Sequence, residues 1–266
     1  TTYGAAPYKD RVPNEDAVIV ERLREAGAVL LGKLTLGALA YGDIWFGGRT
    51  NNPWNLEQGS SGSSAGSAAC TAAGLVGFSI GTETLGSIVS PCTRCGATGL
   101  RPTFGRVPRT GAMALCWSLD KIGPICRTVE DTILVLDAMS GPDAGDASCF
   151  GMPLKYHADQ DFRGVRVGYR PEWFEGERAS PIDRRAFEAV RSLGVELIEI
   201  AIPEAPYAIL FNLLTAEAAA AFEEITLTNT DDQMAWQEER AWPNSFRAQW
   251  FMPAIEYVQM DRFRRR

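Results

Sequence analysis

The chain has 266 residues, 45% of them hydrophobic and 22% charged, with a formal net charge of −7. These values are typical of a globular protein with one large domain or two small ones. They argue against nucleic-acid binding, because the one basic block, at 262–266, fits the solvated last turn of a helix. No apolar run reaches the roughly 18 residues that span a bilayer and no signal-peptide pattern opens the chain, so we expect a cytoplasmic protein.

Helical and extended patterns alternate in the first part of the chain. Residues 16–26 place apolar side chains at helical spacing and stop at Gly27, which predicts a helix. The run at 28–32 predicts a short buried strand, and 33–41 predicts another helix. A helix followed by a strand indicates an α/β layer, and the Gly-, Asn- and Pro-rich stretch 42–57 predicts a loop.

Small residues and turn signals dominate the centre of the chain. The run at 63–74 predicts a helix that packs very closely on its neighbours, and 75–81 predicts a buried strand. The stretch 96–111 is rich in turn residues. A strong apolar face predicts a helix at 127–139, with Thr128 as its N-terminal cap.

The last part of the chain again alternates between the two patterns, after a predicted surface connection. The predicted elements are strands at 164–169 and 195–202 and helices at 182–193, 213–225 and 251–266. In the last of these helices, Pro253 suits the first turn, where its missing N–H costs nothing.

Six cysteines are scattered along the chain, at positions 70, 92, 95, 116, 126 and 149. In a chain this long they do not form the pattern of a disulfide framework. Cys92 and Cys95 form a CxxC, but a single CxxC without a second pair is weak evidence for zinc. Buried thiols are the better interpretation, and no metal site is predicted.

The pattern G-x-S-x-G occurs at 62–66, where it raises the question of a nucleophilic serine. That motif requires a preceding strand and a histidine base, whereas a polar Gly/Ser loop precedes it here. His157 is the single histidine of the chain, and it lies in a loop-like stretch. A Ser–His–Asp triad is therefore a poor explanation.

Lysine is another residue that can activate a serine, provided that burial or neighbouring groups keep its amine deprotonated. Lysines are scarce in this chain, and the whole set is Lys9, Lys33, Lys121 and Lys155.

The stretch at 59–111, which contains SGSSAGS and GTETLGSIVSP, resembles the signature region of the amidase signature family. The segments EAGAVLLGK, FGGRTNNPWN, SLDKIGPICRTVEDTILVLDAMSGPD and AEAAAAFEEI resemble that family too, so the resemblance covers most of the chain. It implies an α/β fold with a mixed, largely parallel central sheet flanked by helices on both faces. It also implies that residues 1–266 form a single domain that is truncated at both ends.

The same resemblance implies a Ser–cis-Ser–Lys catalytic unit. The nucleophile falls on Ser87, and the bridging serine, which follows a non-proline cis peptide bond, falls on Ser63. Ser64 is expected to be a structural hydrogen bonder beside the substrate site. From the residues alone, Ser63 and Ser64 are equally explained as a helix cap and a loop.

Backbone N–H groups before the nucleophile would stabilise the developing oxyanion. By resemblance they belong to Thr84, Leu85, Gly86 and Ser87. The sequence departs from the common family pattern at Leu85 and Ala65, where glycine is usual, and at Val89, where arginine is usual. These departures indicate a different pocket wall without removing the chemistry.

The family lysine lies in a Lys-Asp segment upstream of the stretch that matches TTYG, with which this sequence begins. Lys9 follows that landmark, and Lys33 aligns with a family lysine that is not the base. No lysine of this chain is therefore assigned as the base, and the sequence is interpreted as an internal piece of a longer protein.

The resemblance implies an amidase that hydrolyses a small-molecule amide without a cofactor. The alternatives are the glutaminase-type subunit of a tRNA-dependent amidotransferase, an esterase-like member and a non-catalytic scaffold or binding protein. Neither nucleic acid nor membrane is an expected partner, and the oligomeric state is unassigned, with a homodimer as the candidate. Trp45, Phe46 and Trp117 suit either a pocket wall or the core.

Overall fold

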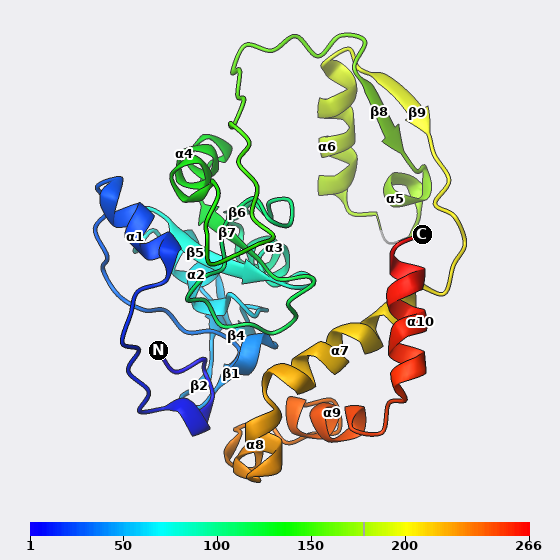
Figure 1. The fold of residues 1–266 in the computed structure, drawn as a ribbon. Helices are drawn as coiled ribbons and strands as arrows, with labels where there is room; N and C mark the ends of the chain where they lie inside the picture. Colours follow the sequence, from blue (N-terminus) through cyan, green and yellow to red (C-terminus); the bar gives the residue numbers. More distant parts are fainter. Residues whose placement is uncertain (178) are drawn as a thin grey trace. The chain divides into compact units, whose positions relative to one another are not determined.

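The structure is a computed structural model that describes residues 1–177 and 179–266. It divides into two compact units (Figure 1). The first consists of Thr1–Leu154 and Ala208–Arg266, and the second of Lys155–Tyr207. Within the described residues, no helix combines the length and the apolar character needed to cross a membrane.

A three-stranded sheet forms the centre of the first unit. Its strands stand in the order β5 (Ser79–Glu83), β7 (Lys121–Cys126) and β6 (Thr98–Gly99), and both pairings are antiparallel. The connection from β5 to β6 runs through a helix, and the two strands point the same way because each is antiparallel to β7. The prediction of a largely parallel sheet is nevertheless wrong for this unit, because β7 inserts between them in the opposite direction.

Helices cover both faces of this sheet, as predicted. They are α1 (Val18–Glu25), α2 (Ala65–Ala72), α3 (Val89–Cys95) and α4 (Val129–Met139). Successive residues of a strand point to opposite faces. Accordingly, Ile122 of β7 packs in a buried cluster with residues of α1 and α4, whereas Ile125 packs with residues of α2 and α3.

The helices predicted at 16–26, 63–74 and 127–139 are confirmed as α1, α2 and α4. The hydroxyl of Thr128 accepts a hydrogen bond from the N–H of Asp131, at 3.2 Å, so Thr128 caps α4 as predicted. The strand predicted at 75–81 is present but begins and ends later.

Two predictions for the segment before residue 42 are wrong. Residues 28–32 form no strand, because no described strand lies beside this run to share its hydrogen bonds. The run is not buried either, since Leu30 is 70% exposed. Residues 33–41 form only the 3₁₀ turn η2 (Ala38–Ala40). Backbone groups here bond to the small-residue region, with the N–H of Gly66 donating to the carbonyl of Thr35 at 2.9 Å.

Four helices close the chain and pack together within the first unit. They are α7 (Leu210–Ala221), α8 (Glu223–Leu227), α9 (Trp242–Gln249) and α10 (Ala254–Arg264), coloured gold to red in Figure 1. The helix predicted at 213–225 is interrupted at Phe222, whose φ of −118° and ψ of 30° leave the helical region. Both α9 and α10 pack against α7.

Short elements complete the first unit. One hairpin pairs β1 (Ile44–Trp45) with β2 (Gly48–Arg49), and another pairs β3 (Asn51–Asn52) with β4 (Asn55–Gly59). Three more 3₁₀ turns are described: η1 (Ala6–Tyr8), η3 (Tyr207–Ile209) and η4 (Thr230–Gln233). The turn η3 begins at the last residue of the second unit. The predicted loop at 42–57 therefore folds into two small hairpins, since its Gly and Asn residues permit tight turns.

The second unit is small and carries the one parallel pairing among the described strands. β8 (Arg166–Tyr169) pairs with β9 (Glu196–Glu199), and α5 (Glu172–Glu175) and α6 (Pro181–Ser192) lie between them in sequence. Ser180 and Asp183 form a reciprocal capping box at the start of α6. These elements confirm the strands and the helix predicted between 164 and 202.

Candidate active site

A cavity of about 320 Å³ opens in the first unit. Its lining residues are Ala40, Tyr41, Gly42, Asp43, Ser61, Gly62, Thr84, Leu85, Gly86, Ser87, Ser90, Leu115, Phe211, Leu214 and Trp242. The cavity thus gathers the two Ser/Gly-rich stretches, the segment after η2, and the helices α7 and α9. Parts of the chain that are distant in sequence therefore meet there.

Hydrogen bonds hold the two Ser/Gly stretches against each other. The N–H of Ser64 donates to the carbonyl of Ser87 at 3.1 Å, and the hydroxyls of Ser61 and Ser90 lie 2.7 Å apart. The peptide bond between Gly62 and Ser63 is cis, as the resemblance predicts.

Two glycines make this approach sterically feasible. A Cβ at Gly62 would lie 1.8 Å from the carbonyl oxygen of Gly42, and a Cβ at Gly37 would lie at the same distance from that oxygen. The N–H of Gly37 donates to the carbonyl of Ser63 at 3.0 Å. Only glycine fits at either position with this backbone.

Ser63 is 1% exposed, and its hydroxyl has no hydrogen-bonding partner among the described residues. Its carbonyl is occupied, since it accepts from the N–H groups of Gly37 and Ala65. Buried polar atoms are usually paired, so an unpaired hydroxyl indicates a missing partner or a functional role. Neighbouring Gly62 lines the cavity.

Ser64 is also buried, but its hydroxyl is fully engaged with the adjacent strand. The Ser64 hydroxyl accepts from the N–H of Thr82 and donates to the carbonyl of the same residue, both at 3.1 Å. This pair of bonds ties the start of α2 to the end of β5. The geometry suits the structural part of the role expected for Ser64.

The loop from Thr84 to Ser87 forms one side of the cavity. Ser87 is half-buried, and Leu85 is 67% exposed. Within the described part of the chain, no acceptor receives the backbone N–H groups of Leu85, Gly86 or Ser87. Free N–H groups in such a loop are available to an anionic oxygen.

Glu83 holds the far end of this loop. Its side chain is 2% exposed, and its Oε2 accepts from the N–H of Ile88 at 2.8 Å and of Val89 at 2.9 Å. These N–H groups belong to the start of α3 and would otherwise be unsatisfied. The carboxylate therefore fixes the helix directly after Ser87.

Thr84 holds the near end through both of its polar groups. Its hydroxyl donates to Oδ1 of Asp120 at 2.6 Å, and its carbonyl accepts from Nζ of Lys121 at 3.0 Å. Burial lowers the pKa of Lys121, and the neighbouring Arg101 acts in the same direction. No sequence pattern indicated these roles for Asp120 and Lys121. The register that places Lys121 opposite Glu83 brings Lys121 to the loop.

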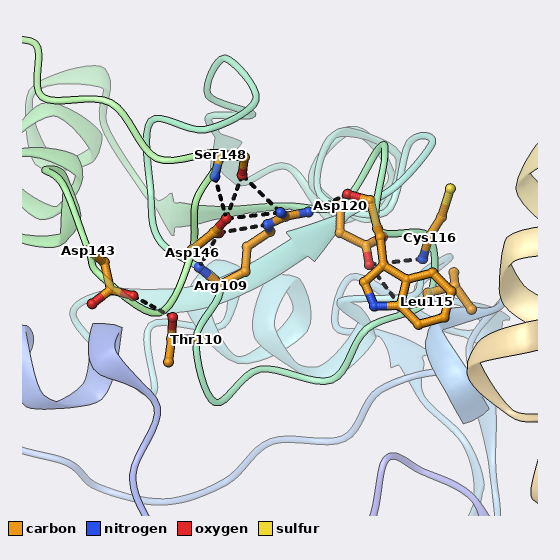
Figure 2. A network of polar contacts seen from close by, with 9 residues as sticks. Arg109, Thr110, Leu115, Cys116, Asp120, Asp143, Asp146 and Ser148 are labelled. Atoms are coloured by element: carbon orange, nitrogen blue, oxygen red, sulfur yellow. Dashed lines mark hydrogen bonds and ion pairs between the residues drawn. The ribbon is translucent and has the colours of Figure 1, made fainter. Parts of the chain in front are cut away.

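A wider network supports Asp120 (Figure 2). Its Oδ2 accepts from the N–H groups of Leu115 and Cys116, at 2.8 and 2.9 Å. In the same loop region, Arg109 donates to both carboxylate oxygens of Asp146, at 2.9 and 3.2 Å. The hydrogen bonds from Arg109 hold the pKa of Asp146 well below its usual range.

The predicted wall residues lie elsewhere. Trp45, Phe46 and Trp117 are not among the described residues that line the cavity, and its aromatic lining comes from Tyr41, Phe211 and Trp242. Of the three departures from the family pattern, only Leu85 is among the described lining residues. Ala65 is fully buried in α2, and Val89 is the first residue of α3.

The remaining chemical candidates lie apart from the cavity lining. Cys92 and Cys95 are both buried, as predicted, and burial raises the pKa of Cys92 to about 12. Among the described residues, no three His, Cys, Asp or Glu side chains are grouped to hold a metal. His157 is exposed, in a stretch of the second unit without regular structure.

Comparison with known proteins gives consistent matches. A family model described as Amidase matches residues 1–259. A glutamyl-tRNA(Gln) amidotransferase subunit of Roseiflexus castenholzii is 43% identical over 229 residues, which are 83% of this chain and 47% of that protein. The chain therefore spans about half the length of the curated relatives it matches.

Solved structures agree in fold. The native peptide amidase from Stenotrophomonas maltophilia superimposes with a TM-score of 0.83 and 29% identity, over 98% of this chain and 60% of that chain. The corresponding glutamyl-tRNA(Gln) amidotransferase subunit of Thermotoga maritima gives a TM-score of 0.81 and 28% identity, over 98% and 58%. By sequence and by fold, the chain belongs to the amidase family and has the amidase-signature fold.

Proposed function

We propose that the full-length protein hydrolyses a carboxamide bond through an acyl-enzyme on Ser87, releasing ammonia or an amine. The observation that carries this proposal is the buried hydroxyl of Ser63, which has no partner in the described chain, while its neighbour Gly62 lines the same cavity as Ser87. A hydroxyl in that position can relay a proton. Membership of the amidase family supports the same reaction class.

The proposed reaction begins when Oγ of Ser87 attacks the amide carbon. The proton of Ser87 passes to Oγ of Ser63, which gives its own proton to a base. The backbone N–H groups of residues 84–87 would stabilise the oxyanion, which is the role that the family resemblance implies for them. The C–N bond breaks as the proton returns through Ser63 to the leaving nitrogen. Water then hydrolyses the ester by the same relay.

The family resemblance predicts a lysine as the base. None of the four lysines of this chain is assigned that role, and Lys121 already donates to the carbonyl of Thr84. In this proposal, the base that receives the proton from Ser63 is an amine outside residues 1–266.

Serine variants of the full-length protein test the proposal. Ser87→Ala is expected to lower kcat on the order of 10⁶-fold, as losing the nucleophile does in serine hydrolases. Ser63→Ala should cost about 10²- to 10⁴-fold, the usual range for proton-transfer groups. Ser192→Ala, an exposed serine of α6, is the matched control and should leave activity unchanged.

Mass spectrometry of the enzyme during turnover should detect the acyl group on Ser87. Unchanged hydrolysis in Ser87→Ala would overturn the proposal and favour a scaffold or binding role. Rates on a matched ester and amide distinguish an amidase from an esterase-like member.

A second candidate is the glutaminase-type subunit of a tRNA-dependent amidotransferase. It is favoured by the 43% identity to the amidotransferase protein of Roseiflexus castenholzii. Such a protein would work with partner subunits and pass its ammonia on. Glutamine hydrolysis that appears only when copurifying partners are present would support this candidate over a free-standing amidase.

A further inference from the structure

Part of the cavity lining is aromatic and aliphatic. Tyr41, Leu115, Phe211, Leu214 and Trp242 form this part. They come from the segment after η2, the loop before β7, helix α7 and helix α9. The lining therefore combines polar groups, among them Ser87, with apolar side chains, which is a typical composition for orienting a small ligand.

Contacts with residues outside the lining hold the rings of Trp242 and Tyr41 in place. The indole N–H of Trp242 donates to the carbonyl of Leu39 at 2.9 Å, and its ring packs on Phe246 with centroids 5.0 Å apart. Tyr41 stacks on Trp236 with centroids 5.1 Å apart and packs against Trp242 at 4.8 Å. These contacts fix the two rings in place before any ligand binds, so a flat ligand meets a preformed surface.

The charge of the lining is negative. Asp43 is the one carboxylate among the described lining residues, and that set includes no lysine or arginine. Its Oδ2 accepts from the N–H of Ser61 at 3.0 Å, which fixes it at the edge of the Ser/Gly loop. A carboxylate on the substrate would therefore meet like charge and no cation from these residues.

We propose that the site takes carboxamides with an apolar, aromatic acyl group that carries no carboxylate, in preference to free glutamine. This inference rests on the proposed amide hydrolysis. It names Phe211 and Asp43 as specificity-determining residues. Phe211 contributes a half-exposed ring that lines the cavity, and Asp43 contributes the charge that disfavours acidic amides.

The substrate test uses the full-length protein and four probes: phenylacetamide, its 4-carboxylate, acetamide and glutamine. The kcat/KM for phenylacetamide should exceed that for acetamide by roughly 10- to 200-fold, the range that a few apolar contacts supply. The kcat/KM values for the 4-carboxylate and for glutamine should both be about ten-fold or more below the value for phenylacetamide. Glutamine equal to or better than phenylacetamide would overturn the inference.

Variants assign the preference to the two residues. Phe211→Ala should raise KM for phenylacetamide about ten-fold and raise KM for acetamide much less. Phe251→Ala, at an exposed phenylalanine outside the lining, is the matched control and should change neither. Asp43→Asn keeps the acceptor for the N–H of Ser61 but removes the charge. It should therefore reduce the difference in kcat/KM between phenylacetamide and its 4-carboxylate. An unchanged difference would remove Asp43 from the inference.

Binding separates this inference from the proposed function. Calorimetry with the Ser87→Ala protein measures phenylacetamide and glutamine without turnover. If phenylacetamide binds more tightly but no amide is hydrolysed by the wild type, the amidase proposal fails while the pocket preference stands. If amides are hydrolysed through Ser87 but glutamine binds more tightly, only the pocket preference fails.

Discussion

Thr84 shows how single residues set the geometry of the candidate nucleophile loop. Its hydroxyl is bound by Asp120 and its carbonyl by Lys121, while Glu83 binds the N–H groups just beyond Ser87. The loop is thereby fixed at both ends, and its own N–H groups stay free to face a ligand. Groups aligned in advance need no rearrangement during the reaction.

Replacing Lys121 with methionine tests this anchoring at the residue scale. The change keeps the length of the side chain but removes the donor to the Thr84 carbonyl, so the loop should shift. We expect kcat to fall about 10- to 100-fold with KM nearly constant, since small misplacements of reacting groups cost that much. Steady-state kinetics of the full-length protein provide the measurement. Lys121→Arg should restore part of the loss, and Lys155→Met, at an exposed position, should have no effect.

Asp146 gives a second prediction at this scale, for stability against pH. Arg109 lowers its pKa in the folded state, so the charged form contributes stability at pH 7. That contribution is complete above the unfolded pKa of about 3.9 and is lost as the pH falls below it.

The Asp146→Asn variant should therefore lose about 3 kcal/mol of unfolding free energy at pH 7, a typical loss for breaking a buried pair. The difference from the wild type should shrink as the pH approaches 2, in urea unfolding curves recorded across that range. Asp16→Asn removes one member of an exposed ion pair with Arg24 and should cost no more than about 1 kcal/mol. A pH-independent difference for Asp146→Asn would contradict the prediction.

At this scale, sequence alone predicted roles for the residues that resemblance could align. Ser63 and Ser87 came from the motif, and the predicted cis bond at Ser63 is present. Lys121 and Asp120 could not be found that way, because their contact with Thr84 depends on the register of β7 against β5. Phe211 reaches the cavity from more than a hundred positions away in the chain, and no local pattern records such a contact.

Helix α7 links the helical group to the candidate site at the scale of elements. Its residues Phe211 and Leu214 line the cavity, and its Glu217 is buried against the loop before β7. Glu217 accepts from the N–H and the hydroxyl of Ser118, at 3.0 and 2.5 Å, and from the hydroxyl of Tyr257 in α10 at 3.4 Å. One carboxylate thus joins α7, α10 and the loop that carries Asp120.

The Glu217→Ala variant should lose about 1–3 kcal/mol of unfolding free energy, because the part-buried N–H of Ser118 would lose its acceptor. It should also raise KM, since α7 carries two lining residues. Chemical denaturation and substrate titration measure the two effects. Glu223→Ala, at an exposed position of α8, is the control and should change neither. A stable variant with an unaltered KM would show that α7 is held by its apolar contacts alone.

Elements with strong local signals were predictable, and those that depend on partners were not. The helices at 16–26 and 127–139 have an apolar face and a clear stop or cap, and both form. The run at 28–32 is as apolar as a buried strand, but a strand forms only beside another one. At 33–41 the backbone bonds instead to the Ser63–Gly66 region, so helical preference did not decide the outcome.

For the whole molecule, the family and the α/β class followed from the sequence, while the direction of the strands did not. The crossover between β5 and β6 has the local features of a parallel layer. The insertion of β7 between them is a long-range event, since some twenty residues of irregular chain separate β6 from β7. Such a choice depends on packing over the sheet faces rather than on any short stretch.

The crowding around the carbonyl of Gly42 has a consequence for mutational tolerance. In a saturation library selected only for folded, soluble protein, positions 37 and 62 should retain glycine, because either Cβ would collide with the same oxygen. Gly77, which has nothing within 4 Å of its Cβ position, should accept many residues in that library. Retention of glycine at both positions would then reflect how closely these backbone segments approach the Gly42 carbonyl, since the library is not selected for catalysis.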